Sequence, residues 1–238
     1  MAEAKLTLGY WKIRGLGAPS RMICEYAGME YQDNQYEVFK KEDGGWDVSA
    51  WFGPEKKQLQ AINPLINLPY VKHGDLVVTQ SNACYTYLGR LCGLNGKTDE
   101  EMTKNEQILA QVMDLRNDLL GILYPFKCTP EAFPEKSKAY MEKEALKHYA
   151  KLEAWLAKQG TTFFSGDSPL TADFHAWEML DQHEITAAKL SYASPLKDFP
   201  KLTAFHKAFR ELPQLQKYFE GDSFKLPMNN KMALVGGC

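Results

Sequence analysis

The chain has 238 residues, of which 30 are acidic and 28 are basic, so its formal net charge is -2. This length fits one large domain or two small ones, and the near balance of charge argues against nucleic acid as a partner because phosphate binding needs a concentrated basic face. No apolar run approaches the roughly 20 residues of a membrane-spanning helix, and the N-terminal residues lack the basic and apolar segments of a signal peptide. We therefore predict a cytoplasmic protein with no membrane partner.

The first 92 residues mix strand and helix patterns. Lys5–Tyr10 alternates polar and apolar residues and predicts a short, half-buried strand. Glycines and a proline then break the chain before a helix expected over Ser20–Gly28. A second strand is predicted near Gln35–Val38, and the strands Leu68–Lys72 and Leu76–Thr79 form a hairpin around a His-Gly-Asp turn.

Two further segments complete this half. Glycines and polar residues in the segment from Gly44 to Lys57 predict a loop, although it also carries two tryptophans. A helix is expected to run to about Cys92, and Ser81 or Asn82 can cap its start. The predicted order is β-α-β-α-β-β-α.

The pattern changes after residues 93–97, whose glycines and asparagine predict a linker. Apolar residues then recur at three- and four-residue steps, which indicates amphipathic helices. The expected helices cover residues 108–123, 141–156, 171–188, 199–210 and 213–219, and residues 224–238 are expected to be irregular. We predict two domains, an α/β domain over residues 1–92 and an all-α domain over residues 98–238.

Cysteine and histidine spacing gives no sign of a metal site. The five cysteines are odd in number and contain no Cys-x-x-Cys pair, so neither a disulfide framework nor a structural zinc site is expected. The five histidines show no His-Glu-x-x-His spacing. We predict no metal, and cysteines that stay reduced and pack as small hydrophobic residues.

Several motifs, in order along nearly the whole chain, resemble those of the mu-class glutathione transferases. Leu8–Leu16 is similar to the opening segment that carries the catalytic tyrosine, and Asn67–Tyr70 and Gln80–Ala83 look like the two segments that hold glutathione. Gln111–Asp114 resembles the segment whose acidic residue reaches the glutathione of the partner subunit, and Lys231–Ala233 resembles the tail. The resemblance implies a thioredoxin-like N-terminal domain, an all-α C-terminal domain, a homodimer, and glutathione as co-substrate.

Tyr10, at the end of the first predicted strand, matches the catalytic tyrosine of that family. A free thiol with a pKa near 8.5 is only a few per cent thiolate at neutral pH, and the thiolate is the nucleophile. A phenol hydroxyl stays protonated and can donate to the sulfur anion, which lowers the thiol pKa. A shift of about 2 units corresponds to about 2.7 kcal/mol, within reach of a charge-assisted hydrogen bond and local dipoles.

The resemblance also implies which residues hold glutathione. Gln80 and Ser81 stand where a strand becomes a helix, and free amide groups there attract the γ-glutamyl carboxylate. Asp114 pairs with the ammonium group, from the other subunit. Leu68 contacts the cysteinyl part through its backbone, next to Pro69, which we expect to follow a cis peptide bond. Contacts with the glycyl end are expected from Trp51, Lys56 and Asn67, and the glutathione set is completed by Trp11 and Leu16.

The electrophile is expected between the two domains. Apolar residues that can line this pocket are Trp11, Ile13, Leu16, Leu120 and Tyr124. Tyr124 matches a mu-class tyrosine that assists some acceptors. The pair Asn229-Asn230 stands where the family has a more apolar wall, so we predict a more polar pocket.

Three positions depart from the mu-class pattern. Asp47–Ala50 lacks the expected arginine, so either Lys41 or Lys57 compensates or glutathione binds more weakly. Leu65 takes the place of the aromatic key of the dimer, which predicts a weaker dimer. Leu170 replaces the Ser or Thr that begins a helix capping box, although Asp173 can still cap locally.

Two other functions stay open. One is a non-catalytic relative that serves as a structural protein or carries hydrophobic ligands, and the other is a sigma-like isomerase that uses glutathione. The intact set Tyr10, Asn67, Gln80 and Ser81 favours catalysis, because a structural protein need not keep a thiol-binding set. The long loop and the Lys-Met-Ala tail favour the mu class over the sigma class.

Overall fold

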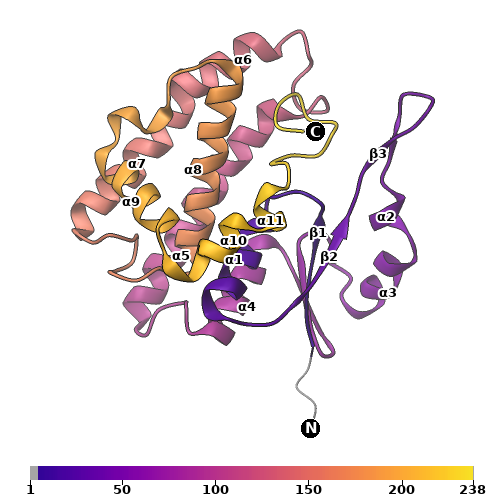
Figure 1. Ribbon diagram of the computed structural model, residues 1–238, viewed down its shortest axis with the longest axis horizontal. Coiled ribbons are helices and arrows are strands. Elements are labelled where there is room, and N and C mark those ends of the chain that lie inside the picture. Colours follow the sequence, from indigo (N-terminus) through magenta and orange to yellow (C-terminus); the bar gives the residue numbers. More distant parts are fainter. Residues whose placement is uncertain (1–4, 238) are drawn as a thin grey trace.

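A four-stranded sheet organises the N-terminal half of the computed structural model, which describes residues 5–237. Its strands are β1 (Leu6–Trp11), β2 (Gln32–Tyr36), β5 (Tyr70–His73) and β6 (Leu76–Thr79), in the spatial order β2-β1-β5-β6. β1 runs parallel to β2 and antiparallel to β5. The helices α1 (Ala18–Ala27) and α4 (Ser81–Cys92) contact each other and separate the sheet from the helical half (Figure 1). Met1–Ala4, where the sequence has no signal-peptide pattern, and Cys238 lie outside the described residues.

The prediction of a loop from Gly44 to Lys57, between the second strand and the hairpin β5–β6, is wrong. The segment instead forms a small hairpin, β3 (Phe39–Lys40) with β4 (Trp46–Asp47), and two helices, α2 (Ser49–Phe52) and α3 (Pro54–Ile62), along the outer edge of the sheet (Figure 1). The helices are short, and only Trp51 and Leu59 in them are buried, so the sequence carries no helical apolar stripe. Pro54 favours a helix start at that position.

The second strand also begins earlier than predicted, at Gln32 rather than near Gln35. Its residues Gln-Asp-Asn-Gln-Tyr are almost all polar, so the alternation that identifies a strand is missing. Pairing with β1, from Thr7 with Gln32 to Trp11 with Tyr36, holds this strand in place. The same register puts Tyr10 next to the last residue of a central strand, where the backbone turns toward α1.

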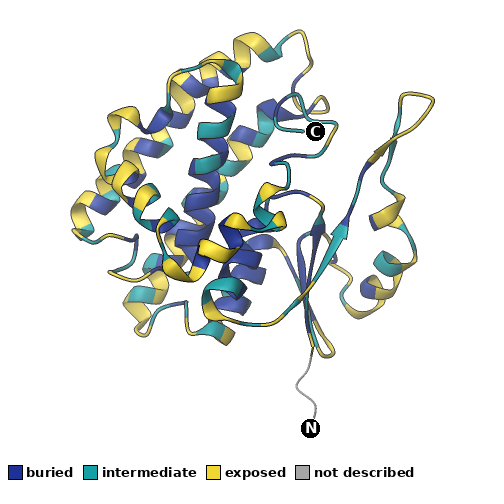
Figure 2. Ribbon diagram, viewed as in Figure 1, coloured by how far each residue is buried: buried dark blue, intermediate teal, exposed yellow. Residues whose placement is uncertain are grey.

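The C-terminal half is helical, as expected. It contains α5 (Asp99–Leu123), α6 (Phe133–Ala139), α7 (Ala145–Gln159), α8 (Thr171–Leu190), α9 (Pro200–Arg210), α10 (Gln216–Glu220) and α11 (Asp222–Lys225). α8 runs through the middle with 14 of its 20 residues buried (Figure 2). After residue 97 the strand-like pairing in the described part of the chain is one bridge between Phe163 and Gly166. No helix in residues 5–237 is long and apolar enough to cross a membrane.

Two helix starts differ from expectation. α4 begins at Ser81 with Gln80 as the preceding cap residue, so neither Ser81 nor Asn82 caps it. Gln80 has φ 72°, a left-handed conformation that is uncommon for a non-glycine residue and often accompanies function. At α8, the Asp173 carboxylate accepts from the amides of Leu170 at 2.8 Å and Phe164 at 2.9 Å, so it caps the helix despite the leucine.

The tail after α11 returns to the sheet. The Arg14 amide donates to the Pro227 carbonyl at 2.8 Å, and the Gly15 amide donates to the Met228 carbonyl at 3.2 Å. The Leu234 amide donates to the carbonyl of Leu123, the last residue of α5, at 2.8 Å. These bonds tie the tail to the loop after β1 and to the end of α5.

Candidate active site

Tyr10 lies at the junction of the two halves, packed against the loop that follows its own strand. A Cβ atom at Gly17 would lie 2.7 Å from the Tyr10 ring, and one at Gly15, where φ is +39°, would lie 2.8 Å from it. Only glycine permits this close approach. Tyr10 also packs with Ile13 and Leu16, and Trp11 and Leu68 border the same cluster.

The Tyr10 hydroxyl makes no hydrogen bond to any of residues 5–237, although the residue is only 7 % exposed. A buried phenol usually has a partner, and one without a partner has its donor available for a ligand. The hydroxyl-bearing side chain borders a cavity that also reaches the helical half. The geometry therefore places a side chain with an unused hydrogen-bond donor in the wall of an interdomain cavity.

The segment before β5 packs against the Tyr10 cluster through Leu68. The peptide bond between Leu68 and Pro69 is cis, as expected. The Asn67 amide donates to the Thr79 hydroxyl at 3.1 Å, and this hydroxyl donates back to the Asn67 carbonyl at 2.8 Å, which fixes the segment before β5 against β6. Ser81 opens α4, a helix of 12 residues whose first amides can bind a carboxylate.

The predicted glycyl-end residues are less accessible. Trp51 is fully buried between the rings of Tyr36 and Tyr70, and its indole N–H has no partner among the described residues. The ammonium group of Lys56 lies over the Phe52 ring, 4.3 Å from its centre. In this arrangement, an indole contact with glutathione requires the covering side chains to move, so the contact stays a prediction.

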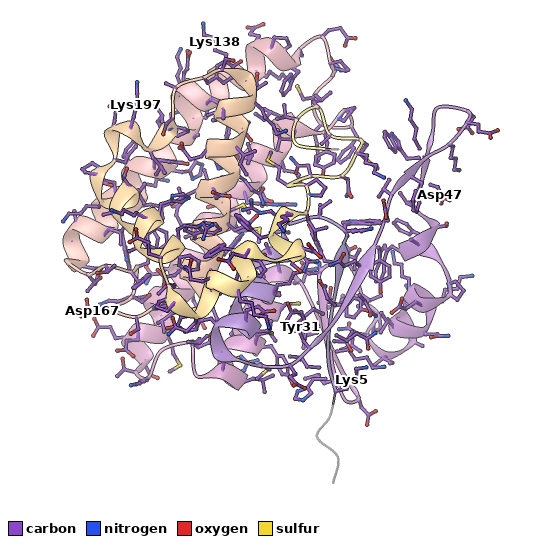
Figure 3. The ribbon with its side chains drawn as sticks, in the orientation of Figure 1. Lys5, Tyr31, Asp47, Lys138, Asp167 and Lys197 are labelled. Carbon is purple, nitrogen blue, oxygen red and sulfur yellow. The ribbon has the colours of Figure 1, made fainter. Side chains whose placement is uncertain are left out.

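The arginine missing from the mu-class pattern has no basic replacement at its own position. Asp47, at the base of the small hairpin, accepts from the Ser49 amide at 2.8 Å and lies on the outer side of the sheet, away from Lys138 and Lys197 of the helical half (Figure 3). Asp114 is exposed on α5, and Leu65 is 73 % exposed. Both are therefore available to a partner subunit.

The electrophile candidates Ile13, Leu120 and Tyr124 do line one cavity, together with Tyr10. Its free volume is only about 20 Å³, far below the roughly 300–1,000 Å³ of pockets for drug-sized ligands. Asn229 of the tail is among its walls, whereas Trp11 and Leu16 are outside them. The tail therefore limits the size of this cavity.

Three polar or polarisable lining residues were not predicted from the sequence, namely Arg116, Met179 and Gln182. Arg116 stands three residues before Leu119 and seven before Leu123, both in the lining, so helical periodicity could have revealed it. Its only side-chain hydrogen bond among the described residues is to Asn117 at 3.1 Å, and no carboxylate there pairs with it. A half-buried cation without a counter-ion favours negative charge in the cavity.

Tyr124 can act as a second donor. Burial raises the pKa of its phenol to about 12, although the bond from the Asn230 amide opposes the shift, so the group keeps its proton at neutral pH. Its oxygen accepts from that amide at 3.2 Å, which orients the hydroxyl. The proton remains free for a substrate oxygen.

A buried ion cluster fixes the loop after β1, whose residues Gly15 and Gly17 pack against the Tyr10 ring. The Arg14 guanidinium donates to both carboxylate oxygens of Glu178 at 3.0 and 2.8 Å and to Asp181 at 2.6 Å. Burial alone would lower the pKa of Arg14, but the charges of Glu178 and Asp181 raise it above its ordinary value. The loop after β1 is thus bound to α8 across the two halves.

Comparison with known proteins agrees with this geometry. The family model described as "Glutathione S-transferase, N-terminal domain" matches residues 6–90, and the one described as "Glutathione S-transferase, C-terminal domain" matches residues 113–222. The chain is 33 % identical to human Glutathione S-transferase Mu 3, covering 98 % of this chain and 96 % of that protein. It is 36 % identical to rat (Rattus norvegicus) Glutathione S-transferase Mu 2, covering 96 % and 97 %.

The fold has solved counterparts as well. The crystal structure of the glutathione S-transferase Blo t 8 aligns with a TM-score of 0.80 at 28 % identity, covering 97 % of this chain and 99 % of that one. The expected thioredoxin-like half and all-α half are thereby confirmed. The chain belongs to the glutathione S-transferase family, and its curated relatives named above are mu-class members.

Proposed function

We propose that this protein is a cytoplasmic glutathione transferase that conjugates the glutathione thiolate to electrophiles, and that the Tyr10 hydroxyl activates the thiol. The observation that carries the proposal is the free donor of Tyr10, which borders the interdomain cavity and has no partner among the described residues. A sulfur placed there accepts this hydrogen bond, and the bond favours the thiolate over the thiol. This step uses the phenol donor and the local dipoles around it, and it calls for no metal.

The rest of the glutathione site follows from the backbone. The first amides of α4, at Ser81 beside Gln80, hold the γ-glutamyl carboxylate, and the segment before cis-Pro69 pairs with the cysteinyl part. The glycyl end lies toward Asn67 and Lys56. We propose a homodimer in which Asp114 of one subunit meets the ammonium group of glutathione in the other, and a thiol-binding domain over residues 1–92 beside a helical domain over residues 98–238.

The cavity also indicates a class of electrophile. Its walls include Arg116, Tyr124, Gln182 and Asn229, and its free volume is about 20 Å³. We propose small electrophiles whose negative charge develops on oxygen as sulfur attacks, such as unsaturated carbonyl compounds and nitroaromatic rings. Arg116 and the Tyr124 proton stabilise that oxygen, because preorganised donors act on charge that appears in the transition state.

The test is the substitution Tyr10→Phe, with Tyr124→Phe as the matched control. Tyr10→Phe should raise the pKa of enzyme-bound glutathione by about 2 units and lower kcat/KM about 100-fold, since a unit is worth about 1.36 kcal/mol. Thiolate absorbance against pH measures the first quantity, and conjugation of a chloro-dinitrobenzene acceptor the second. Tyr124→Phe should leave the thiol pKa unchanged. An unaltered thiol pKa in Tyr10→Phe would sink the proposal.

A further inference from the structure

A second, smaller cavity also borders Tyr10 and takes no part in the steps above. Its volume is about 10 Å³, and its walls come from β1, α1, β2 and the cis-proline segment. Three of its lining residues, Tyr10, Gly17 and Pro69, belong to the thiol site or its support. Whatever fills this cavity therefore touches the framework that places the Tyr10 hydroxyl.

Three buried polar atoms on lining residues lack a partner among the described residues. They are the Ser20 hydroxyl, Nη2 of Arg21 and Oδ1 of Asp33. Ser20 is 3 % exposed and Arg21 only 1 % exposed, so bulk solvent does not reach them. A buried donor of a cation and a buried carboxylate oxygen are costly to leave unsatisfied.

The chemistry of these atoms fits one water molecule. A cavity must offer about 10–15 Å³ and two to four polar partners to hold a water, and this one offers about 10 Å³ and three partners. Nη2 of Arg21 donates to a water oxygen, Oδ1 of Asp33 accepts a water proton, and the Ser20 hydroxyl can do either. An organic ligand or a hydrated ion is too large for the space.

Arg21 connects this cavity to the catalytic loop. Its Nε donates to Oδ2 of Asp33 on β2 at 2.8 Å, and its Nη1 donates to the Ile13 carbonyl at 2.9 Å. Ile13 lies in the loop whose glycines pack on the Tyr10 ring. Because a guanidinium is a rigid planar fork, a partner at Nη2 also fixes the direction of the bond to Ile13.

We propose that Ser20, Arg21 and Asp33 bind one buried water molecule, and that Arg21, oriented by this water, is a positioning residue for the Tyr10 hydroxyl. The water completes the hydrogen bonds of the guanidinium and keeps the loop after β1 at one distance from β2. The positioning role rests on the proposed thiol activation by Tyr10, whereas the water site stands without it.

A high-resolution crystal structure of the full chain tests the water site directly. We expect one ordered water within hydrogen-bond distance of the Ser20 hydroxyl, Nη2 of Arg21 and Oδ1 of Asp33. A dry cavity would overturn the proposal, and so would direct pairing of these three atoms with one another.

The positioning role is tested by Ser20→Ala, which removes one water partner and keeps every direct bond of Arg21. Ser165→Ala is the matched control, because the Ser165 hydroxyl is also buried without a partner but lies outside this cavity. Ser20→Ala should raise the pKa of bound glutathione by about half a unit and lower kcat about threefold, a fraction of the ~100-fold that a misplacement of about 1 Å can cost. KM for glutathione should stay unchanged.

A larger change is expected in Arg21→Lys, since an ammonium group cannot hold Asp33, Ile13 and the water together. If this variant does not fold, Ser20→Ala still decides the question. Equal thiol pKa values in Ser20→Ala and Ser165→Ala would refute the positioning role. Should Tyr10→Phe itself leave the thiol pKa unchanged, the proposed function fails, while the crystallographic water still tests the site.

Discussion

The thiol side and the electrophile side of the site differ in how far apart their residues lie along the chain. Every proposed thiol-side group except Asp114 comes from the first 81 residues and lies at a strand end, in the loop after β1, in the segments after β2, or at the start of α4. The electrophile cavity takes residues from β1 and its loop, α5, α8 and the tail, from Tyr10 to Asn229. Local backbone geometry builds one side, and the packing of distant segments builds the other.

This difference separates chemistry from specificity. Strand ends and helix starts present fixed donors, so the thiol side changes little when the helices shift. The electrophile side depends on how α5, α8 and the tail meet, so modest changes there alter size and polarity. We therefore expect variants on the two sides to affect different kinetic constants, and variants of the links between them to affect both.

The largest stability effect is expected from Arg14→Met, which breaks the link between the sides. This substitution leaves Glu178 and Asp181 without their buried counter-charge, and removing one partner of a buried pair costs about 3–5 kcal/mol. Urea unfolding should show a loss in that range. Lys12→Met is the control, because its ion pair with Glu37 is exposed and contributes about 1 kcal/mol at most. A loss in Arg14→Met no greater than in the control would show that the cluster does not hold the two halves together.

The next effect concerns the stability in acid of α8, the helix that contributes Met179 and Gln182 to the electrophile cavity. Burial lowers the pKa of His175 to about 3 and that of His183 to about 4, and both lie on α8. Unfolded histidine titrates near 6.5, so below this pH the unfolded state binds more protons and is favoured. Above about pH 6.5 these two histidines should not make the free energy of unfolding depend on pH. This free energy should then fall by up to about 1.4 kcal/mol per pH unit for each histidine as the pH drops toward 4.

His175→Phe should remove one of these two contributions. Unfolding curves measured from pH 7 to pH 4.5 should show a shallower loss for the variant than for the wild type, by about 2 kcal/mol over the range. The phenylalanine ring also keeps the contact that His175 makes with Tyr85, whose rings lie 5.2 Å apart. Parallel curves for the two proteins would mean that His175 does not set the acid response.

Arg116→Met tests whether the electrophile side acts alone. Losing the unpaired guanidinium should lower kcat/KM for a nitroaromatic acceptor about tenfold, which equals about 1.4 kcal/mol of transition-state stabilisation. KM for glutathione and the pKa of its thiol should change little. Steady-state kinetics with each substrate varied in turn separates these quantities. An equal loss for glutathione would place Arg116 on the thiol side and remove the distinction drawn above.

The contrast between local backbone geometry and the packing of distant segments also explains which features the sequence could predict. Tyr10, Leu68, Pro69 and Ser81 belong to contiguous motifs, so their placement at strand ends and at the start of α4 followed from short patterns. The long helices carry regular apolar stripes, so each was predicted, although α5 begins at Asp99 rather than at residue 108, and the segment 213–219 forms a 3-10 turn followed by α10.

Features made by distant packing escaped prediction. Helical periodicity could place Arg116 on the cavity-facing side of α5, but nothing in the sequence near Gln182, on α8, reports that it faces the same cavity. The short helices α2 and α3 bury too few residues to leave a period, and β2 is held by pairing rather than by its own polar residues. The burial of Trp51 likewise depends on Tyr36 and Tyr70, which come from two different strands.

The smallest effect on stability should come from Lys231→Met, in the tail after α11. Lys231 pairs with Glu37 at 3.0 Å, and Lys12 pairs with the other oxygen of the same carboxylate at 2.9 Å. The hydrogen bond from Lys12 is the largest cause that lowers the pKa of Glu37 below its ordinary value, and the hydrogen bond from Lys231 is the next largest. The pair is largely exposed, so its loss should lower stability by only about 0.5 kcal/mol, and less at high salt.

Lys231→Met should nevertheless change the preference between acceptors of different size, because Lys231 belongs to the tail. Because Asn229 helps to close the electrophile cavity, a looser tail should raise kcat/KM for a bulky acceptor relative to a small one, about twofold for a change of ~0.4 kcal/mol. Lys12→Met is the matched control, since it weakens the same carboxylate pair from the sheet side and leaves the tail bound. If both variants shift the acceptor ratio equally, the charge at the rim governs selectivity; if only Lys231→Met shifts it, the position of the tail does.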